Sequence, residues 1–244
     1  MSDVIHTDLL PLPELDTRVI GKKISCFIET DSTNALALEA CMEGGVFVSE
    51  HQTAGRGRHG KRWHSAAGLG LWFSVCLAGP LPGVNFAAAL AVRDAVANAL
   101  PLTVKWPNDL YVGSSKVCGI LLEQRHEWIA LGIGLNVNHK PDDFPPALRH
   151  RATSLALATG RYWDRRKLLV RLLETLDRQV CQLRQGESNR IREEWIQACD
   201  IIGRHIRRGI VCGLVIAVED DGALVVQTRT GLHRVTDGDI FIVD

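Results

Sequence analysis

Residues 55–63 read Gly-Arg-Gly-Arg-His-Gly-Lys-Arg-Trp, and their types and spacing suit the binding of an anion. Three glycines and four cations fall within eight residues, and no acidic residue occurs between Glu50 and Asp94. Glycine lets the backbone approach a ligand closely, while arginine and lysine donate hydrogen bonds to phosphate or carboxylate. The stretch therefore predicts a loop that closes over an anionic ligand. A solvated basic turn is the alternative that the loop alone leaves open.

The same glycines match two phosphate-binding motifs, and the surrounding sequence argues against both. Their spacing fits the dinucleotide fingerprint, which requires a helix after the glycines and an acid about 20 residues later. Here a strand-like run follows, and residues 75–80 contain no acid. Gly60 and Lys61 nearly complete a P-loop, but Arg62 stands where serine or threonine would bind magnesium.

Composition excludes several classes of protein. The 244 residues are 46% hydrophobic and 23% charged, and 28 basic residues equal 28 acidic ones. This balance is typical of a soluble globular protein, so we expect no general affinity for nucleic acid or for an anionic membrane. The N-terminus lacks the pattern of a signal peptide. The uncharged stretch 68–92 is interrupted at 78–83 by glycine and proline, so neither half is long enough to span a bilayer.

Cysteine and histidine spacing gives no sign of a disulfide framework or a metal site. The seven cysteines are scattered singly without a C-x-x-C pair, and the nine histidines show no metal-ligand spacing. We expect buried free thiols, no structural metal, and a cytoplasmic protein.

Strand-like and helix-like segments alternate irregularly, which predicts an α+β fold with a mixed β-sheet flanked by helices. We expect strands at 24–29, 46–50, 68–77, 103–106, 110–112, 116–124 and 128–137. Helices are expected from a cap at 31–34 to residue 42 before Gly44-Gly45, at 85–100, from Asp164 along a leucine stripe to Leu183, and at 188–199.

After residue 203 the pattern changes to short β segments joined by turns, at 211–219, 223–228, 233–235 and 239–243. We therefore expect two domains: residues 1–199, with an irregular lead-in over 1–23, and a small β-barrel domain over 200–244. One basic cluster of the second domain is interpreted as a solvated strand face rather than a ligand site: Arg204, Arg207 and Arg208.

Four consecutive residues of helix-capping type, Asp31-Ser32-Thr33-Asn34, follow the first expected strand. Two interpretations stay open. The residues form either a plain N-terminal cap or a polar binding surface, because a capped helix start keeps spare hydroxyl and amide groups.

Five motifs in sequence order resemble those of the bacterial biotin–protein ligases, also called holocarboxylase synthetases. They are Asp31-Ser32-Thr33-Asn34, Gln52-x-Ala54-Gly55-Arg56-Gly57-Arg58-x-Gly60, Lys105-Trp106-Pro107-Asn108-Asp109, Lys116-x-x-Gly119-Ile120-Leu121 and Gly132-Ile133-Gly134-Leu135-Asn136-Val137-Asn138. Ala152-Thr153-Ser154-Leu155 and the terminal β segments are also similar to the family, so the resemblance covers roughly residues 24–244. It implies a class II synthetase-like catalytic domain followed by an SH3-like β-barrel.

The resemblance implies an ATP-dependent ligase that acts in two steps. The carboxylate of biotin first joins the α-phosphate of ATP, with Mg²⁺, to give biotinyl-5′-AMP. A lysine of a carboxylase's biotin-carrier domain then takes the biotin. Because two anions meet in the first step, cations must neutralise both. By resemblance Lys116 bridges carboxylate and α-phosphate and Arg58 also faces the phosphate, so these two are the expected catalytic residues.

The resemblance also implies the ligand contacts. A buried site must satisfy the two N–H donors and the carbonyl of the ureido ring of biotin. The expected biotin contacts are Ser32, Thr33, Asn34, Gln52, Arg56, Gly57, Arg58 and Lys116. The expected nucleotide contacts are Arg58, Lys61, Trp63, Asn108, Asp109 and Asn136, with Asn136 at the adenine edge and Asn108 or Asp109 near the magnesium-bound phosphates. No metal ligand is assigned beyond Asp109.

The glycine-rich loop is expected to order over the ligand along residues 55–65, because a mixed anhydride must be shielded from water. Trp63 then folds over the ligand, with a position in the core as the alternative. His59 and Lys61 stand at variable places in the loop pattern, so their individual roles stay open. Whether the C-terminal domain touches ligand or carrier also stays open.

Some members of the family carry an N-terminal helix-turn-helix domain and repress transcription. Only about 23 residues precede the first expected catalytic strand, so we expect a ligase without DNA binding. A homodimer is compatible with the sequence, which does not determine the oligomeric state. Two other functions stay open: a lipoate or octanoate ligase of the same fold, whose acyl chain lacks the ureido group, and a non-catalytic module that binds biotin.

Overall fold

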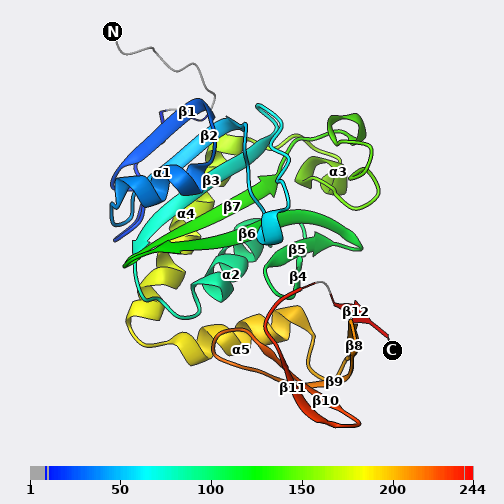
Figure 1. Ribbon diagram of the computed structural model, residues 1–244. Helices are drawn as coiled ribbons and strands as arrows, with labels where there is room; N and C mark the ends of the chain where they lie inside the picture. Colours follow the sequence, from blue (N-terminus) through cyan, green and yellow to red (C-terminus); the bar gives the residue numbers. More distant parts are fainter. Residues whose placement is uncertain (1–8, 10, 239, 244) are drawn as a thin grey trace.

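The computed structural model describes residues 9, 11–238 and 240–243. These residues form a seven-stranded sheet with helices on both faces and a separate five-stranded sheet at the C-terminal end (Figure 1). Two predictions reach beyond them: residues 1–8 and 10 of the lead-in, and Asp239 of the expected last strand, lie outside the described residues.

The larger sheet is mixed, as the alternation of elements predicts. Its strands occur in the order β1-β2-β3-β7-β6-β5-β4; β1 pairs with β2 in parallel, and the other neighbouring pairs are antiparallel. The register places Gly134 of β7 opposite both Trp72 of β3 and Gly119 of β6. The strands are β1 (Ile24–Thr30), β2 (Val46–Gln52), β3 (Gly70–Ala78), β4 (Thr103–Lys105), β5 (Asp109–Val112), β6 (Ser115–Arg125) and β7 (Trp128–Asn136).

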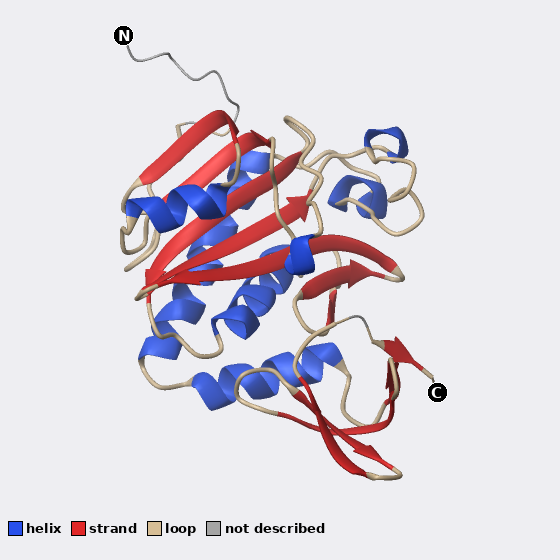
Figure 2. Cartoon of the chain, in the orientation of Figure 1, coloured by secondary structure: helices blue, strands red, loops and turns tan. Residues whose placement is uncertain are grey.

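Helices cover the two faces of this sheet unequally (Figure 2). The α1 helix lies on one face, where Ala37 packs with Phe47, Cys76 and Ala130. The α2 and α4 helices pack together on the other face, over the main hydrophobic core. The helices are α1 (Thr33–Ala40), α2 (Val84–Val96), α3 (Leu155–Thr159), α4 (Arg165–Arg184) and α5 (Ser188–Cys199), with 3-10 turns η1 (Arg58–Gly60) and η2 (Pro141–Asp143). None of the described helices is both long and apolar enough to cross a bilayer.

A buried ion pair ties the start of α4 to the end of β2. Arg165 donates from Nη1 to Glu50 Oε2 at 2.6 Å and from Nη2 to Glu50 Oε1 at 3.2 Å. The same Nη1 donates to the carbonyl of Gly70 at 3.1 Å. Because a two-pronged guanidinium–carboxylate pair fixes orientation as well as distance, it holds together the two strand ends between which the glycine-rich loop runs.

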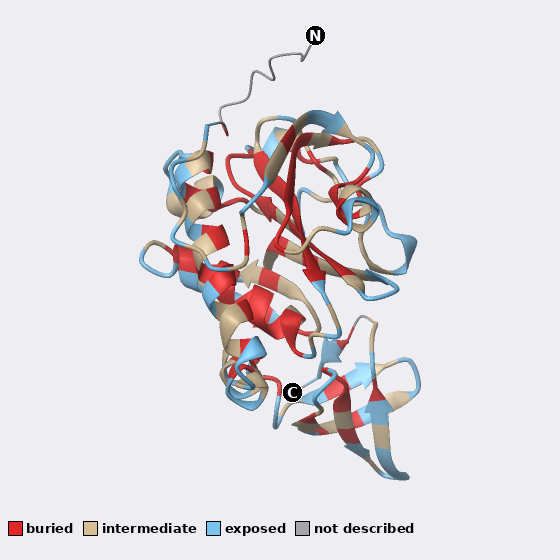
Figure 3. Cartoon of the chain, turned by 90° about the vertical axis from the view of Figure 1, so that its left-hand side faces the viewer, coloured by how far each residue is buried: buried red, intermediate tan, exposed pale blue. Residues whose placement is uncertain are grey.

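The second sheet is antiparallel, in the order β11-β10-β9-β8-β12. It contacts the larger unit through Trp106, whose Nε1 donates to the carbonyl of Gly222 at 2.8 Å. Figure 3 shows that buried residues concentrate in the larger sheet and its helices, while the C-terminal sheet is more exposed. A small C-terminal β unit is thus confirmed, and its boundary at residue 200 stays a prediction. The strands are β8 (His205–Arg208), β9 (Val211–Val218), β10 (Leu224–Thr228), β11 (Gly231–Val235) and β12 (Phe241–Ile242).

The structure corrects some element boundaries. The α1 helix ends at Ala40 rather than at residue 42, because Cys41 adopts a φ of 47° and closes the helix before Gly44. The α2 helix ends at Val96 rather than at residue 100. Between β7 and α4, where no helix was predicted, the structure contains α3, whose N-cap Ser154 accepts a hydrogen bond from the backbone N–H of Leu157.

The basic cluster of the C-terminal sheet is largely engaged in ion pairs. Arg204 pairs with Asp200, and Arg208 pairs with Asp237 at 2.9 Å. These pairs agree with the interpretation of the cluster as a solvated face.

Candidate active site

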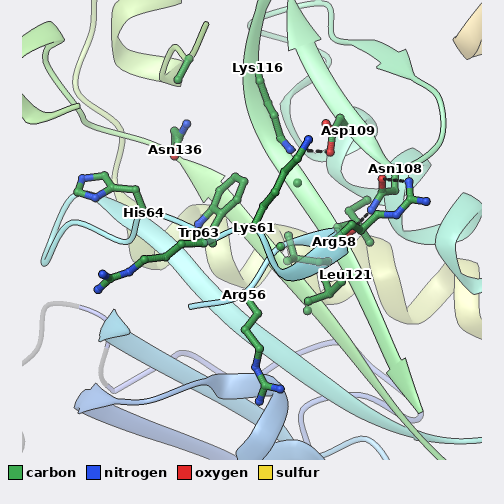
Figure 4. A pocket seen from close by; sticks show the side chains of 18 of the residues that line it. Arg56, Arg58, Lys61, Trp63, His64, Asn108, Asp109, Lys116, Leu121 and Asn136 are labelled. Carbon is green, nitrogen blue, oxygen red and sulfur yellow. Dashed lines mark hydrogen bonds and ion pairs between the residues drawn. The ribbon is translucent and has the colours of Figure 1, made fainter. Parts of the chain in front are cut away.

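One cavity of about 620 Å³ opens over the α1 face of the larger sheet (Figure 4). Three residues near the chain end, Gly238, Ile240 and Phe241, also contribute to its wall. Every residue that the sequence assigned to biotin, nucleotide or catalysis lines this cavity: Ser32, Thr33, Asn34, Gln52, Arg56, Gly57, Arg58, Lys61, Trp63, Asn108, Asp109, Lys116 and Asn136. The fold therefore brings together residues that are more than a hundred positions apart in the chain.

The start of α1 forms a buried polar cluster in the cavity wall. Gln52 Oε1 accepts hydrogen bonds from the backbone N–H of Thr33 at 2.9 Å and from its Oγ1 at 3.2 Å. Ser74 Oγ lies 2.7 Å from Thr33 Oγ1 and 2.6 Å from Asn34 Oδ1. Ser32 occupies the N-cap position, but its hydroxyl makes no capping bond. The structure thus favours a polar binding surface over a plain cap.

Each amide of this cluster has its orientation set by its neighbours. The two hydrogen bonds from Thr33 use the acceptor capacity of Gln52 Oε1, so the Nε2 donor is left for the cavity. Asn34 Nδ2 donates to Glu123 Oε2 at 2.8 Å and to the carbonyl of Leu121 at 3.4 Å. Asn34 Oδ1 accepts from Ser74 and has a second lone pair. The two amides therefore offer a ligand the Nε2 donor group of Gln52 and an acceptor position on Asn34 Oδ1.

Glycines of β6 and β7 form a floor without side chains. A Cβ added at Gly132 would lie 2.3 Å from Asn34 Oδ1, and one at Gly134 would lie 2.6 Å from the indole of Trp63. A Cβ at Gly119 would lie 2.8 Å from the same indole. Because real Cβ atoms do not approach other atoms this closely, the floor must be glycine for both neighbours to reach it.

Trp63 lies on this floor and not in the core between sheet and helices. Its ring packs edgewise on Trp72, with ring centroids 6.1 Å apart. Its Nε1 is buried and has no hydrogen-bond partner among the described residues. The expectation that Trp63 belongs to the cavity agrees with this position, and its contact with a ligand stays a prediction.

The glycine-rich loop is a tight hairpin in this structure. The backbone N–H of Gly57 donates to Lys61 at 2.7 Å, and that of Trp63 donates to Gly55 at 2.9 Å. His59 has a φ of 56° and turns the chain at the tip. Arg56, near the base of the hairpin, and Arg58, in the turn at its tip, extend in different directions (Figure 4).

Lys116 enters the cavity from a β-bulge. The register between β5 and β6 shifts so that Leu110 faces Cys118 while Tyr111 faces Lys116. Bulges re-aim side chains, and here Lys116 Nζ reaches Asp109 Oδ1 at 2.7 Å. The same Nζ lies 5.2 Å from the centroid of the Trp63 ring, within range of a cation–π contact.

The other predicted nucleotide contacts have partners within the protein. Arg58 Nη1 donates to Asn108 Oδ1 at 3.3 Å, and Asn108 Nδ2 donates to the carbonyl of Ile120. Asn136 Nδ2 donates to the carbonyl of Thr153 at 3.0 Å. These bonds fix the side chains at the cavity wall, and their contact with ATP stays a prediction.

Asp109 is the residue that fits magnesium. Mg²⁺ is usually bound through one or two carboxylates together with substrate phosphates. Asp109 lies in the cavity about a quarter exposed, with one oxygen on Lys116. Within the described ranges, no three His, Cys, Asp or Glu side chains gather to enclose a metal. Asp109 therefore suits an ion shared with the phosphates of ATP rather than one held by protein alone.

A buried histidine supports the wall behind Trp72. His139 is 1% exposed, and its ring stacks on Phe144 with centroids 4.8 Å apart. Burial, with a smaller contribution from nearby His64, lowers the pKa of His139 to about 4. Neither ring nitrogen has a hydrogen-bond partner among the described residues, so the ring acts as a neutral packing element.

Some residues of the site were missed from the sequence. Ser74 and Glu123 complete the hydrogen bonds of Asn34, but a serine or a glutamate within a strand carries no local signal of function. Gly119, Gly132 and Gly134 belong to the quoted motifs, yet their role depends on what packs above them. Which side chains pack above these glycines can be seen only in the three-dimensional structure.

Comparison with known proteins agrees with this geometry. Residues 25–138 match the Biotin/lipoate A/B protein ligase family. A biotin–[acetyl-CoA-carboxylase] ligase of Paracoccus denitrificans is 33% identical, over 87% of this chain and 97% of that protein. The bifunctional ligase/repressor BirA of Bacillus subtilis is 31% identical, over 93% of this chain and 76% of that protein. A solved biotin protein ligase from Aquifex aeolicus, in complex with biotin and ATP, is 27% identical with a TM-score of 0.79, over 91% of this chain and 99% of that one.

The fold and the cation-lined cavity thus define a ligase of the biotin/lipoate type. The identity and coverage of the relatives narrow this class, and the chain belongs to the biotin–protein ligase family. The family, the mixed-sheet fold and the ATP-dependent ligase activity expected from the sequence are confirmed.

Gly134→Ala is expected to displace Trp63, because the added Cβ would lie within the van der Waals distance of the indole. Since small misplacements at an active site cost about 100-fold in rate, biotin-dependent pyrophosphate release should fall by that order. Leu135→Val, which changes the opposite face of the same strand, is the matched control. An activity of Gly134→Ala equal to that of Leu135→Val would contradict the role of the floor.

His139→Phe is expected to flatten the pH dependence of stability. The pKa of His139 is about 4 in the folded chain against an ordinary value of 6.5, so the unfolded state binds the proton first as pH falls. Wild-type stability should therefore decrease, relative to the variant, between pH 6.5 and about 4, by at most about 1.4 kcal/mol per pH unit. Urea unfolding at several pH values measures this difference. If the free energy of unfolding depended on pH in the same way in both proteins, the buried ring of His139 would not have the lowered pKa described above.

Proposed function

We propose that this chain joins biotin to ATP and then to a lysine of a biotin-carrier domain, with the predicted residues in the roles described below. The observation that carries the proposal is the convergence of a buried donor–acceptor cluster and a group of cations in a single cavity. A ureido ring needs the first, and the meeting of a carboxylate with a triphosphate needs the second.

The ring of biotin binds at the start of α1. Gln52 Nε2 donates to the ureido carbonyl, and Asn34 Oδ1 accepts from a ureido N–H, because these are the atoms that the surrounding hydrogen bonds leave for the cavity. Ser32 and Thr33 supply the remaining polar contacts. Since each amide is held by protein neighbours, the site is preorganised before the ligand arrives.

Lys116 and Arg58 act at the reacting carboxylate and α-phosphate. A carboxylate oxygen attacks the α-phosphorus, the bond to the bridging oxygen breaks, and pyrophosphate leaves with its electron pair. Cations lower the repulsion between the two anions and stabilise charge at phosphorus. Lys116 is held by Asp109 in the free chain, so it reaches the ligand when that carboxylate turns toward the phosphates. Magnesium, when bound with ATP, supplies further charge neutralisation there.

The second step transfers the acyl group to the carrier domain of a biotin-dependent carboxylase. The lysine amine attacks the acyl carbon of biotinyl-5′-AMP, an amide bond forms, the anhydride bond breaks, and AMP leaves while the amine loses its proton. The glycine-rich loop shields the anhydride until that domain arrives. All seven cysteines are free thiols, which suits a reducing compartment such as the cytoplasm.

Lipoate and octanoate ligases are the second candidate. Their acyl chains have no ureido group, and they leave the buried donor of Gln52 and acceptor of Asn34 without partners. The cluster therefore favours biotin. ATP–pyrophosphate exchange with biotin, lipoate and octanoate in turn distinguishes the candidates.

Lys116→Ala is expected to reduce biotin-dependent ATP–pyrophosphate exchange by about 100- to 1,000-fold, as other losses of transition-state charge stabilisation do. The thermal unfolding midpoint should change little, because the Lys116 side chain lies in the cavity and not in the core. Lys167→Ala, at an 86% exposed side chain, is the control. Full exchange activity in Lys116→Ala would remove its assigned role.

Biotin with ATP is expected to protect the glycine-rich loop from trypsin. The loop offers four basic cleavage points between residues 55 and 65, and ordering over the ligand should slow cleavage there. Cleavage at Arg229, in the exposed turn between β10 and β11, should be unaffected and serves as the internal reference. Equal rates of loop cleavage with and without ligands would count against the shielding role.

A further inference from the structure

The carboxylate of Glu123 is shared between the polar cluster and the glycine-rich loop. Glu123 lies on β6, and its side chain is 26% exposed. Its Oε2 accepts a hydrogen bond from Asn34 Nδ2 at 2.8 Å. Its Oε1 accepts one from Arg56 Nη1 at 3.2 Å. One side chain outside the cavity lining therefore contacts both parts of the site.

The hydrogen bond to Glu123 sets the orientation of the Asn34 amide. A carboxylate and a backbone carbonyl can only accept hydrogen bonds, so the NH₂ of Asn34 must turn toward Glu123 and Leu121. This leaves Oδ1 against Ser74 and the cavity. Without the carboxylate, a flipped amide would turn its NH₂ toward the N–H groups of a ureido ring, and two donors would face each other. Glu123 therefore keeps Asn34 Oδ1 facing the cavity, where it can accept a hydrogen bond from a ureido N–H.

The same carboxylate attaches the loop at its first arginine. An exposed ion pair is usually weak, and the Arg56 side chain is 51% exposed. Here, however, Glu123 is already oriented by the buried Asn34, so less conformational freedom is lost when Arg56 binds to it. Arg56 directly follows Gly55, whose carbonyl accepts the hydrogen bond from Trp63 that closes the hairpin. Holding Arg56 therefore holds the base of the loop.

We propose that Glu123 is a positioning residue for biotin, which sets the Asn34 amide and links the loop to the ring site through Arg56. Biotin binding then favours the state in which Arg56 of the glycine-rich loop is paired with Glu123. The reason is that the same carboxylate stabilises both the Asn34 amide that binds biotin and the base of the loop. This inference rests on the proposed function, since it assumes that the cluster at the start of α1 binds the ring of biotin.

Two substitutions separate the two roles. Glu123→Ala removes both contacts, so the Kd for biotin should rise about tenfold or more, as expected when a buried hydrogen bond to a charged group is lost. The KM for ATP at saturating biotin should stay within about twofold. Glu123→Gln keeps one oxygen for Asn34 and removes the charge that attracts Arg56. Its biotin affinity should stay within about threefold of wild type, while trypsin should cleave the biotin-bound loop as fast as in Glu123→Ala.

Glu127→Ala, at an exposed position in the turn of the same β6–β7 hairpin, is the matched control and should behave as wild type in both assays. Thermal unfolding midpoints check the fold of each variant. Unchanged biotin affinity in Glu123→Ala would overturn the proposal. So would a uniform loss, in which the unfolding midpoint and the affinities for biotin and ATP all fall together, because a merely structural residue would give that result.

Calorimetry of biotin binding keeps this test independent of turnover. A wild-type chain that binds biotin without pyrophosphate exchange would overturn the proposed ligase reaction alone, and the Glu123 variants would still be compared by Kd. A wild-type chain that binds no biotin would overturn both. A biotin-selective loss in Glu123→Ala, restored in Glu123→Gln, supports the positioning role.

Discussion

The site depends on one steric constraint, which is that three positions of β6 and β7 beneath the cavity must be glycine. Gly132 admits Asn34, and Gly119 and Gly134 admit Trp63, all at distances that a methyl group would prevent. The polar cluster and the loop therefore share a floor, although they come from separate segments of the chain. The floor belongs to the two longest antiparallel pairings of the sheet, so its backbone is held by hydrogen bonds on both sides of β7.

Charge and neutral polarity are separated along this floor. The start of α1 provides oriented amides and hydroxyls for a neutral ring, while Lys116, Arg58 and Asp109 provide charge for a carboxylate and phosphates. Each functional side chain is held by a neighbour: Gln52 by Thr33, Asn34 by Glu123, Arg58 by Asn108 and Lys116 by Asp109. This second layer of contacts orients the site before any ligand is present, which is the arrangement that lowers the cost of binding and reaction.

Much of this architecture could be predicted from the sequence, because strong local signals mark it. Strand-like runs predicted the strands of the larger sheet, and the predicted site residues all line one cavity. The end of α1 was wrong, since Cys41 adopts a left-handed conformation that glycine usually supplies. Glu123 and Ser74 could not be predicted, because their roles arise only where β3 and β6 meet α1. The assignment of each side chain to a ligand atom stays a prediction.

Transfer of biotin to a carrier domain is the most direct test of the proposed ligase reaction. Intact-mass spectrometry would follow the biotin-carrier domain of an acetyl-CoA carboxylase incubated with this chain, biotin, ATP and magnesium. We expect the addition of one biotin, which requires ATP and is abolished when the acceptor lysine is replaced by arginine. A chain that binds biotin but leaves the carrier unmodified, or that loads lipoate or octanoate in its place, would contradict the proposed reaction.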